Sequence, residues 1–177
     1  MTTTADGTRA EPAIEETVHI AAPPEVVWGL VTDLTRMGEW SGQARGGRWL
    51  GGRGPAVGSR FLGHNKLGRI RWTTTCVVRE FEPPRRFVFR NEQNRAQWVY
   101  ELTPEDGGTR VVHRRELPLG RPAMAKFIAL LVFGGGAKFD ASIPPAMRQT
   151  LAGVKATAEA TAEAATEGTD RGTDRPG

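Results

Sequence analysis

The stretch VHIAAPPEVVW, residues 18–28, changes from a strand pattern to a helix pattern within a few residues. Apolar side chains alternate with polar ones before Ala22, which predicts a first strand over residues 15–22. The proline pair that follows ends the strand and suits the first turn of a helix, where the acidic Glu25 is favourable beside the positive helix start. The sequence therefore predicts a strand that passes directly into a helix.

Two tryptophans frame this helix. Trp28 lies at its centre, near Val27 and Val31 on one apolar face, so the helix is amphipathic and should pack on a sheet. Trp40 lies beyond the end of the helix, in a polar turn. The two indoles either fill a core or line a space that a ligand occupies, and the helix alone does not decide between these roles.

The length of 177 residues suits one domain. Residues 1–13 and 166–177 are rich in Thr, Gly, Asp and Pro and have little to bury, which predicts disordered tails on a single domain at residues 14–165. The N-terminus lacks the basic start and apolar run of a secretory signal, and the lone Cys76 excludes an internal disulfide. We therefore expect a cytoplasmic protein.

The middle of the chain has the pattern of an antiparallel meander. Glycines crowd between residues 46 and 58, which predicts turns between short strands, because the segment lacks the ending of a phosphate-binding loop. Glu105–Gly108, with the sequence EDGG, marks a tight hairpin. Further strands are predicted at residues 58–68, 69–82, 85–91, 97–104 and 109–117.

The last third of the chain is helical. MAKFIALLVF, residues 124–133, is the longest apolar stretch and is well short of the roughly 20 residues that cross a bilayer. The glycines at 134–136 end this helix, and a second helix should begin near residues 142–145, with Asp140 beside its start. Residues 124–136 have two candidate roles: a core segment, or a mobile lid that covers a cavity mouth or touches a membrane transiently.

A strand, a helical interruption, a run of antiparallel strands and a closing helix form an α+β layer architecture. Six stretches resemble the SRPBCC superfamily: V-x-I-x-A-P-P-E-x-V-W at 18–28, V-G-S-R-F at 57–61, V-x-E-F-E-P-P-R-R-F at 78–87, W-x-Y-E-L-T-P at 98–104, G-G-T-R-V at 107–111 and M-R-Q-T-L at 147–151. The resemblance covers about residues 14–160. It implies the START-like helix-grip fold, a curved antiparallel sheet of about seven strands wrapped around a long C-terminal helix, with short helices between strands 1 and 2.

The resemblance also implies a cavity between the sheet and the last helix that holds a hydrophobic small molecule, either lipid-like, aromatic or polyketide-like. It does not imply a reaction, because this fold serves carriers, receptors and cyclases alike. In this order of elements we expect Trp28 to anchor the fold and Trp40 to lie near the cavity rim. The expected ligand-binding residues are Trp40, Trp72, Phe87, Phe89, Trp98, Met147 and Leu151.

Three polar side chains are candidates for chemistry in the same cavity. If Trp98, Tyr100 and Leu102 face inward, alternation on the neighbouring strand aims His113 and Arg115 inward as well. A histidine can move a proton, an arginine can hold an enolate, and a buried tyrosine hydroxyl needs a partner. His113, Arg115 and Tyr100 are thus the candidate catalytic residues of a polyketide cyclase/dehydratase-type enzyme. The alternative is a His113 that lies at the rim, hydrogen-bonded to a neighbour.

The strand at 69–82 carries two alternating sets of side chains. Trp72, Thr74 and Cys76 form one set, and the sequence leaves open whether this set or the other faces the cavity. Cys76 lies mid-strand, where a buried thiol is inert. Histidines and carboxylates nowhere follow a metal-binding spacing, so we expect neither a metal nor a cofactor.

Positive charge is concentrated in the middle of the chain. Between Arg45 and Arg121 there are fifteen arginines against seven acidic residues. A sheet with one solvated face needs such polar residues, and a basic surface for an acidic partner or nucleic acid is the other interpretation. We favour the solvated face, so nucleic acid is not an expected partner. An interaction module that uses the arginine-rich strands is the third functional hypothesis, and the sequence does not determine the oligomeric state.

Overall fold

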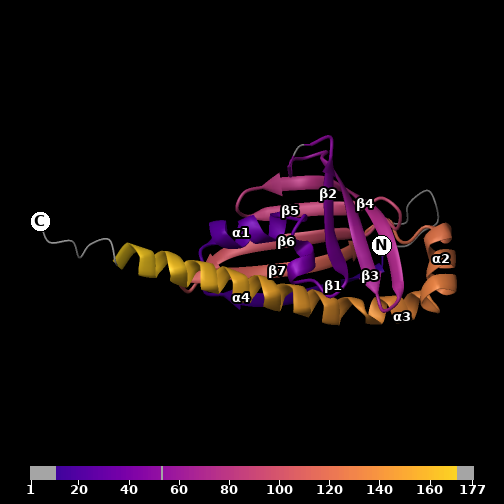
Figure 1. The fold of residues 1–177 in the computed structure, drawn as a ribbon. Helices are drawn as coiled ribbons and strands as arrows, with labels where there is room; N and C mark the ends of the chain where they lie inside the picture. Colours follow the sequence, from indigo (N-terminus) through magenta and orange to yellow (C-terminus); the bar gives the residue numbers. More distant parts are fainter. Residues whose placement is uncertain (1–10, 53, 171–177) are drawn as a thin grey trace, which may run out of the picture.

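The computed structural model describes residues 11–52 and 54–170. Seven strands form one antiparallel sheet: β1 (Glu11–Ile20), β2 (Ala44–Leu50), β3 (Arg60–Leu67), β4 (Ile70–Glu82), β5 (Arg86–Asn91), β6 (Gln97–Glu105) and β7 (Gly108–Leu117). The helices are α1 (Pro24–Thr32), the short 3-10 helix η1 (Met37–Glu39), α2 (Ala123–Phe133), α3 (Gly136–Ala141) and α4 (Ile143–Asp170). The long helix α4 runs along the sheet, and α2 and α3 stand at one end of it (Figure 1). The predicted α+β helix-grip architecture is confirmed.

The order of strands in the sheet is β1-β7-β6-β5-β4-β3-β2. Consecutive strands from β2 to β7 are neighbours, as expected of a meander joined by short turns, and β1 returns beside β7 with Val18 opposite Val111. β1 and β2 therefore form the two edges of the sheet. α1 and η1 carry the chain from one edge to the other, which explains why the helical interruption falls between the first two strands.

The helix α1 packs against the sheet through its apolar face. Pro23 and Pro24 stand at its start, as predicted, and Val27 and Val31 are fully buried. The ring of Trp28 lies against Phe81 and Phe87, with ring centroids 5.3 and 6.3 Å apart. Trp28 thus anchors the fold, as the sequence predicted.

The boundaries differ from the sequence prediction in three places. β1 begins at Glu11 and α4 continues to Asp170, so residues 11–13 and 166–170 belong to regular elements and not to tails. The other predicted tail residues lie outside the described part of the chain. The first part of the glycine-rich segment, residues 46–50, belongs to β2, in which Gly46 has a left-handed backbone with φ of 79°.

Membrane-spanning potential is limited to one combination of helices in the described residues. No single helix there is both long and apolar enough to cross a bilayer. Taken together, Ala123–Leu131 and Gly136–Thr166 meet the criteria of length and composition, but the two parts are bent by 80° at the glycines between them.

Candidate ligand-binding site

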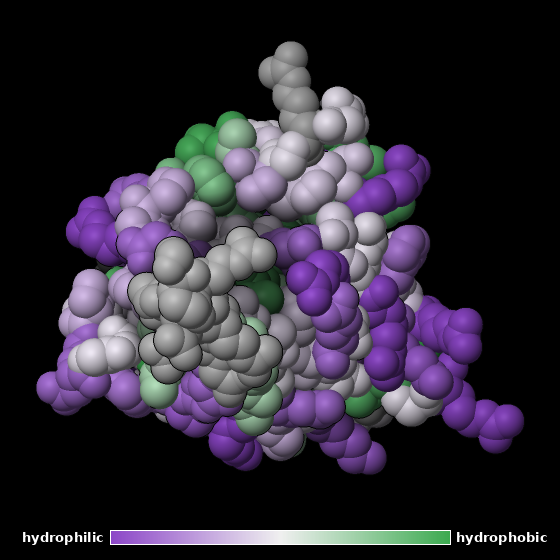
Figure 2. All heavy atoms as spheres, turned by 60° about the vertical axis from the view of Figure 1, so that its left-hand side comes forward, coloured by the Kyte–Doolittle hydropathy of each residue, from purple (hydrophilic) through white to green (hydrophobic). Residues whose placement is uncertain are grey.

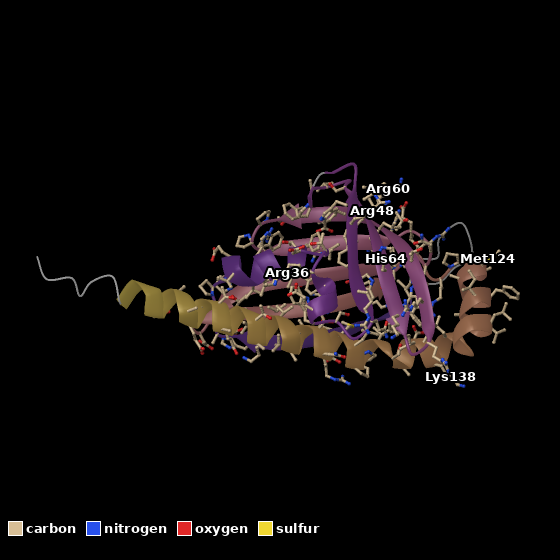
Figure 3. The ribbon with its side chains drawn as sticks, viewed as in Figure 1. Arg36, Arg48, Arg60, His64, Met124 and Lys138 are labelled. Carbon is tan, nitrogen blue, oxygen red and sulfur yellow. The ribbon has the colours of Figure 1, made fainter. Side chains whose placement is uncertain are left out.

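A pocket lies between the sheet and the helices α3 and α4, with a volume of about 150 Å³. Its walls come from the η1 region, from β2 to β7, and from the helices that close the sheet. The exposed His64 on β3 belongs to the lining and is labelled in Figure 3. The lining residues are Leu34, Met37, Ser41, Gln43, Ala44, Gly46, Phe61, Gly63, His64, Asn65, Trp72, Thr74, Cys76, Phe89, Asn91, Asn94, Trp98, Tyr100, His113, Arg115, Phe139, Ile143, Ala146, Met147 and Thr150.

Aromatic rings from three strands form much of the sheet side of the pocket. Trp72, Phe89 and Trp98 all belong to the lining, and Trp98 lies opposite Phe89 in the pairing of β6 with β5. On β4 the pocket is lined by Trp72, Thr74 and Cys76, so the structure resolves the register that the sequence left open. Met147 faces these rings from α4.

Tyr100 and His113 form a stacked pair on the wall of the pocket. They are direct partners in the pairing of β6 with β7, and their rings are nearly parallel, with centroids 4.1 Å apart and an interplanar angle of 11°. The ring of Trp98 lies on the same side, 5.5 Å from the imidazole. His113 is only 4% exposed, and neither imidazole nitrogen has a hydrogen-bond partner among the described residues. The alternative of a hydrogen-bonded rim histidine was therefore wrong.

Burial keeps both members of this pair uncharged. It lowers the pKa of His113 to about 3, because a charged imidazolium loses its hydration in the pocket wall. It raises the pKa of Tyr100 above its ordinary value for the corresponding reason. At neutral pH the pocket therefore presents a neutral imidazole, with one nitrogen that donates and one that accepts, beside a protonated phenol.

Arg115 brings a positive charge to the same wall. It lies opposite Trp98 in the sheet and is 4% exposed. Burial lowers its pKa, and the carboxylate of Asp140, whose oxygen lies 3.4 Å from Nη1 of Arg115, opposes that effect. Asp140 also accepts a hydrogen bond from Arg121 at 2.8 Å, and Arg121 reaches Glu11 at 2.8 Å.

This cluster corrects the expected role of Asp140. The sequence placed Asp140 at the start of the last helix, whereas the structure places it in α3, with α4 beginning at Ile143. Its carboxylate connects α3 to two buried arginines, Arg115 of β7 and Arg121 of the segment between β7 and α2. A second connection runs from Gln43, whose Nε2 donates to the Oγ of Ser142 at 3.1 Å.

Three of the predicted ligand-binding residues do not line the pocket. Phe87 is fully buried in the core, where it packs against Trp28 and Phe81. Leu151 lies in the same core cluster. Trp40 is 4% exposed, and its indole N–H donates to the sulfur of Met37 at 3.1 Å.

The position of Trp40 depends on a close approach of α4. A Cβ built on Gly153 would lie 2.2 Å from the Cβ of Trp40, so only a glycine permits this contact. Trp40 thus belongs to the core between the turn and α4, and not to the cavity rim as expected. The remaining predicted residues, namely Trp72, Phe89, Trp98, Met147, Tyr100, His113 and Arg115, come together in the pocket.

Several lining residues were not predicted from the sequence. Phe139 and Ile143 enter from α3 and the start of α4. Asn91 enters from the end of β5, and Asn94 from the turn after it. The asparagines carry no local signal of pocket lining, because turn residues of this type are common everywhere. The apolar pair could have been suspected from its place between the glycines and the last helix.

Nucleophile and metal chemistry receive no support in this pocket. Burial raises the pKa of Cys76 to about 11, so the thiol stays protonated at neutral pH. Within residues 11–52 and 54–170, no group of three His, Cys, Asp or Glu side chains could hold a metal ion.

Many arginines of the strands are engaged in ion pairs. Arg86 pairs with Glu80 and Glu101, and Arg114 pairs with Glu15 and with the same Glu101. Arg60, Arg79, Arg90 and Arg110 each lie within 4 Å of a glutamate carboxylate. Arginines of the strands thus lie beside glutamates on the sheet, and three of them share Glu92.

Comparison with solved structures supports the fold. The two-domain ARO/CYC protein StfQ of the steffimycin biosynthetic pathway is 15% identical with a TM-score of 0.67, and the two-domain ARO/CYC protein BexL of the BE-7585A pathway is 20% identical with a TM-score of 0.62. Each alignment covers 85% of this chain, which spans about half of each two-domain protein (51% and 50%). The Polyketide_cyc-like protein Cgl2372 of Corynebacterium glutamicum is 28% identical over 93% of this chain and 97% of its own, with a TM-score of 0.49.

The sequence itself matches a family model over most of its length. No curated relative matches the chain. Residues 11–159 match the family described as polyketide cyclase / dehydrase and lipid transport. This range includes the whole sheet, the pocket and most of α4. The chain therefore belongs to the polyketide cyclase/dehydrase and lipid transport family, within the SRPBCC superfamily that its sequence motifs resemble.

Proposed function

We propose that this protein binds a hydrophobic small molecule in the pocket, and that the ligand carries a hydroxyl or carbonyl group on an aromatic ring. The observation that supports this most directly is His113. Its imidazole is buried, faces an aromatic-lined pocket, and has no hydrogen-bond partner among the described residues. Buried polar groups are nearly always hydrogen-bonded, and a ligand hydroxyl would supply the partner.

The size and composition of the pocket agree with such a ligand. Trp72, Phe89 and Trp98 offer ring surfaces for stacking, and Met147 adapts to irregular shapes. An apolar cavity of about 150 Å³ is large enough for one benzene-sized ring. A phenolic hydroxyl both donates and accepts, which matches the two nitrogens of a neutral imidazole. A lipid-like or polyketide-like ligand would place one such group at this site.

The proposal is tested by a cycle of two ligands and two proteins. Phenol and benzene differ only in the hydroxyl, and His113→Phe removes the imidazole nitrogens while it keeps a ring stacked on Tyr100. With wild type, isothermal titration should show phenol binding about tenfold more tightly than benzene, because a satisfied hydrogen bond contributes about 1–1.5 kcal/mol. With His113→Phe, phenol should bind no more tightly than benzene, because its hydroxyl loses its partner.

A matched control is available at the exposed His19, which lies outside the pocket and bonds to the carbonyl of Glu105. His19→Phe should retain the tenfold preference for phenol. Equal binding of phenol and benzene to wild type, or a preference that survives in His113→Phe, would overturn the proposal.

A polyketide cyclase/dehydratase activity is the second candidate, because Tyr100, His113 and Arg115 line one wall of the same pocket. In such a reaction an enol carbon attacks a ketone carbon of the same chain and one water is lost. General acids and bases work best when their pKa lies near the operating pH, and burial moves the pKa of His113 to about 3. The pKa of His113 in the ligand-free protein is therefore far from the operating pH of a general acid or base. This favours the binding function over the enzymatic one.

The two candidates differ in what His113→Phe removes. If the protein is an enzyme, a linear poly-β-ketone should cyclise faster in its presence than in buffer, and His113→Phe should abolish the acceleration while benzene still binds. If the protein is a carrier, the rate in buffer and the rate with wild type should be the same.

We place this binding in the cytoplasm as part of the same proposal, since the lone Cys76 suits a reducing compartment.

A further inference from the structure

The helix α2 presents large apolar side chains to the outside. Five of them are between 47% and 68% exposed, namely Met124, Phe127, Ile128, Leu130 and Leu131. We call these five residues the α2 patch. Ala129, in contrast, is buried. A helix on the surface of a globular protein normally has the reverse arrangement, with its large apolar residues toward the core.

Both ends of α2 are well defined. Pro122 stands at its start, and Gly134 ends it in a left-handed conformation with φ of 72°. The next amide, of Gly135, donates to the carbonyl of Ala129 at 3.0 Å. α2 packs against α3 and stands at the end of the molecule, with Met124 on its outer part (Figure 3). Ala129 thus faces the protein, Ala125 is half-buried, and the α2 patch faces outward.

The charge around the patch is positive. Residues 121–141 contain three cations, Arg121, Lys126 and Lys138, and one carboxylate, Asp140. Asp140 is already engaged with Arg121 and Arg115. Lys126 and Lys138 are exposed, and a Cβ on Gly134 would lie 3.5 Å from Nζ of Lys138, which places that ammonium group at the end of α2.

The size of the patch argues against a second copy of the chain as its partner. If each side chain exposes roughly 100 Å², the five cover on the order of 500 Å², whereas each partner of a standard interface buries about 800 Å². Large apolar residues flanked by lysines are the composition of helices that lie in the interface of an anionic bilayer. The face of the molecule seen in Figure 2, turned away from α2, is by contrast mostly hydrophilic.

We propose that α2 is a docking surface for an anionic membrane, with the α2 patch in the acyl-chain boundary and Lys126 and Lys138 at the lipid headgroups. The segment beyond Gly134 and Gly135 is α3, whose Phe139 lines the pocket. Docking through α2 would therefore bring one wall of the pocket close to the bilayer. The docking surface does not depend on which molecule the pocket binds.

The experiment is sedimentation of the full chain with vesicles of phosphatidylcholine alone or mixed with phosphatidylglycerol. Wild type should bind the mixed vesicles and bind them less as salt increases. Leu131→Glu should lower the partition coefficient at least tenfold, because it removes apolar area and adds a charge of the wrong sign. Val57→Glu is the matched control, since Val57 is 67% exposed against 68% for Leu131, and it should bind as wild type does.

The electrostatic part has its own pair of variants. Lys126→Gln should lower binding to the mixed vesicles about fivefold, the equivalent of about 1 kcal/mol for one cation near the surface. Arg48→Gln removes the same charge from the exposed part of β2 and should have little effect.

Three results would overturn the docking proposal. Wild type could fail to bind the mixed vesicles, Leu131→Glu could bind as well as Val57→Glu, or wild type could form a dimer that Leu131→Glu dissociates while vesicles are ignored. Phenol titration of Leu131→Glu without lipid separates this proposal from the pocket function. If Leu131→Glu still binds phenol but no longer binds vesicles, both proposals are supported. If wild type does not bind phenol, only the pocket proposal is overturned.

Discussion

Replacing Gly153 with alanine tests how closely α4 must approach Trp40. The new Cβ would lie 2.2 Å from the Cβ of Trp40 and 2.9 Å from its Cα, whereas carbon atoms in contact are normally about 3.5–4.0 Å apart. Both atoms of Trp40 are fixed to the backbone, so a rotation of the indole does not relieve the overlap. The helix or the turn that holds Trp40 must move by more than about 1 Å.

Two effects of opposite sign set the magnitude. Alanine favours a helix interior over glycine by about 1 kcal/mol. Overpacking of a core costs about 1–3 kcal/mol, and the upper part of that range applies because the neighbours are rigid. The free energy of unfolding should therefore fall by about 1–2 kcal/mol, which lowers the midpoint of thermal unfolding by about 3–6 °C for a domain of this size.

Gly29→Ala is the matched control. Gly29 lies in α1 and is exposed, and a Cβ there would meet no atom within 4 Å other than those of its chain neighbours and the helix backbone. The same substitution should therefore raise the free energy of unfolding by about 0.5–1 kcal/mol. Urea unfolding followed by circular dichroism measures both variants. A Gly153→Ala protein that is as stable as Gly29→Ala would refute the close contact of α4 with Trp40.

Three further predictions concern the pocket and its supports. Burial puts the folded-state pKa of His113 at about 3, below its ordinary 6.5. As the pH drops below about 6.5, His113 is therefore protonated in the unfolded chain but not in the folded protein, and the free energy of unfolding falls. At pH 4.5 wild type should have lost about 2–3 kcal/mol that His113→Phe does not lose, as urea unfolding across pH would show. Asp140→Asn should cost about 2 kcal/mol in the same assay, since Arg115 and Arg121 stay buried without its charge; Glu16→Gln, at a more exposed pair, should cost less than about 1 kcal/mol. Cys76, whose pKa burial raises to about 11, should resist iodoacetamide at pH 8 in the folded protein and react in denaturant, as intact mass would show.

Local patterns predicted most of the sheet, because alternation along a strand is fixed by the backbone itself. The inward direction of His113 follows from its register opposite Tyr100, and the apolar face of α1 follows from helical spacing. The prediction that Trp40 lies at the cavity rim was wrong, because the position of Trp40 depends on a distant part of the chain. Its surroundings depend on Gly153 of a helix far along the chain, and no neighbouring residue carries that information.

The same distinction explains two other differences. The sequence predicts a helix over residues 121–133, but the pattern does not say which face of the helix finds a partner. The outward orientation of the α2 patch therefore could not be derived from it. Asp140 looked like a helix-start residue because it lies, with Ser142, just before the predicted start of the last helix. Its actual partners, Arg115 and Arg121, are brought to it only by the fold.

The two sides of the pocket are held by different forces, and this decides where it can widen. The sheet side is fixed by continuous strand pairing from β3 to β7. Ion pairs of Arg86 and Arg114 with Glu101 add to this support. The helix side, by contrast, is connected through side chains, with Asp140 bound to arginines and Gln43 donating to Ser142. Breaking a few such contacts costs far less than disrupting a strand ladder in a packed sheet. A ligand larger than one ring would therefore be accommodated by displacement of α3, none of whose side chains is buried, and not by deformation of the aromatic wall.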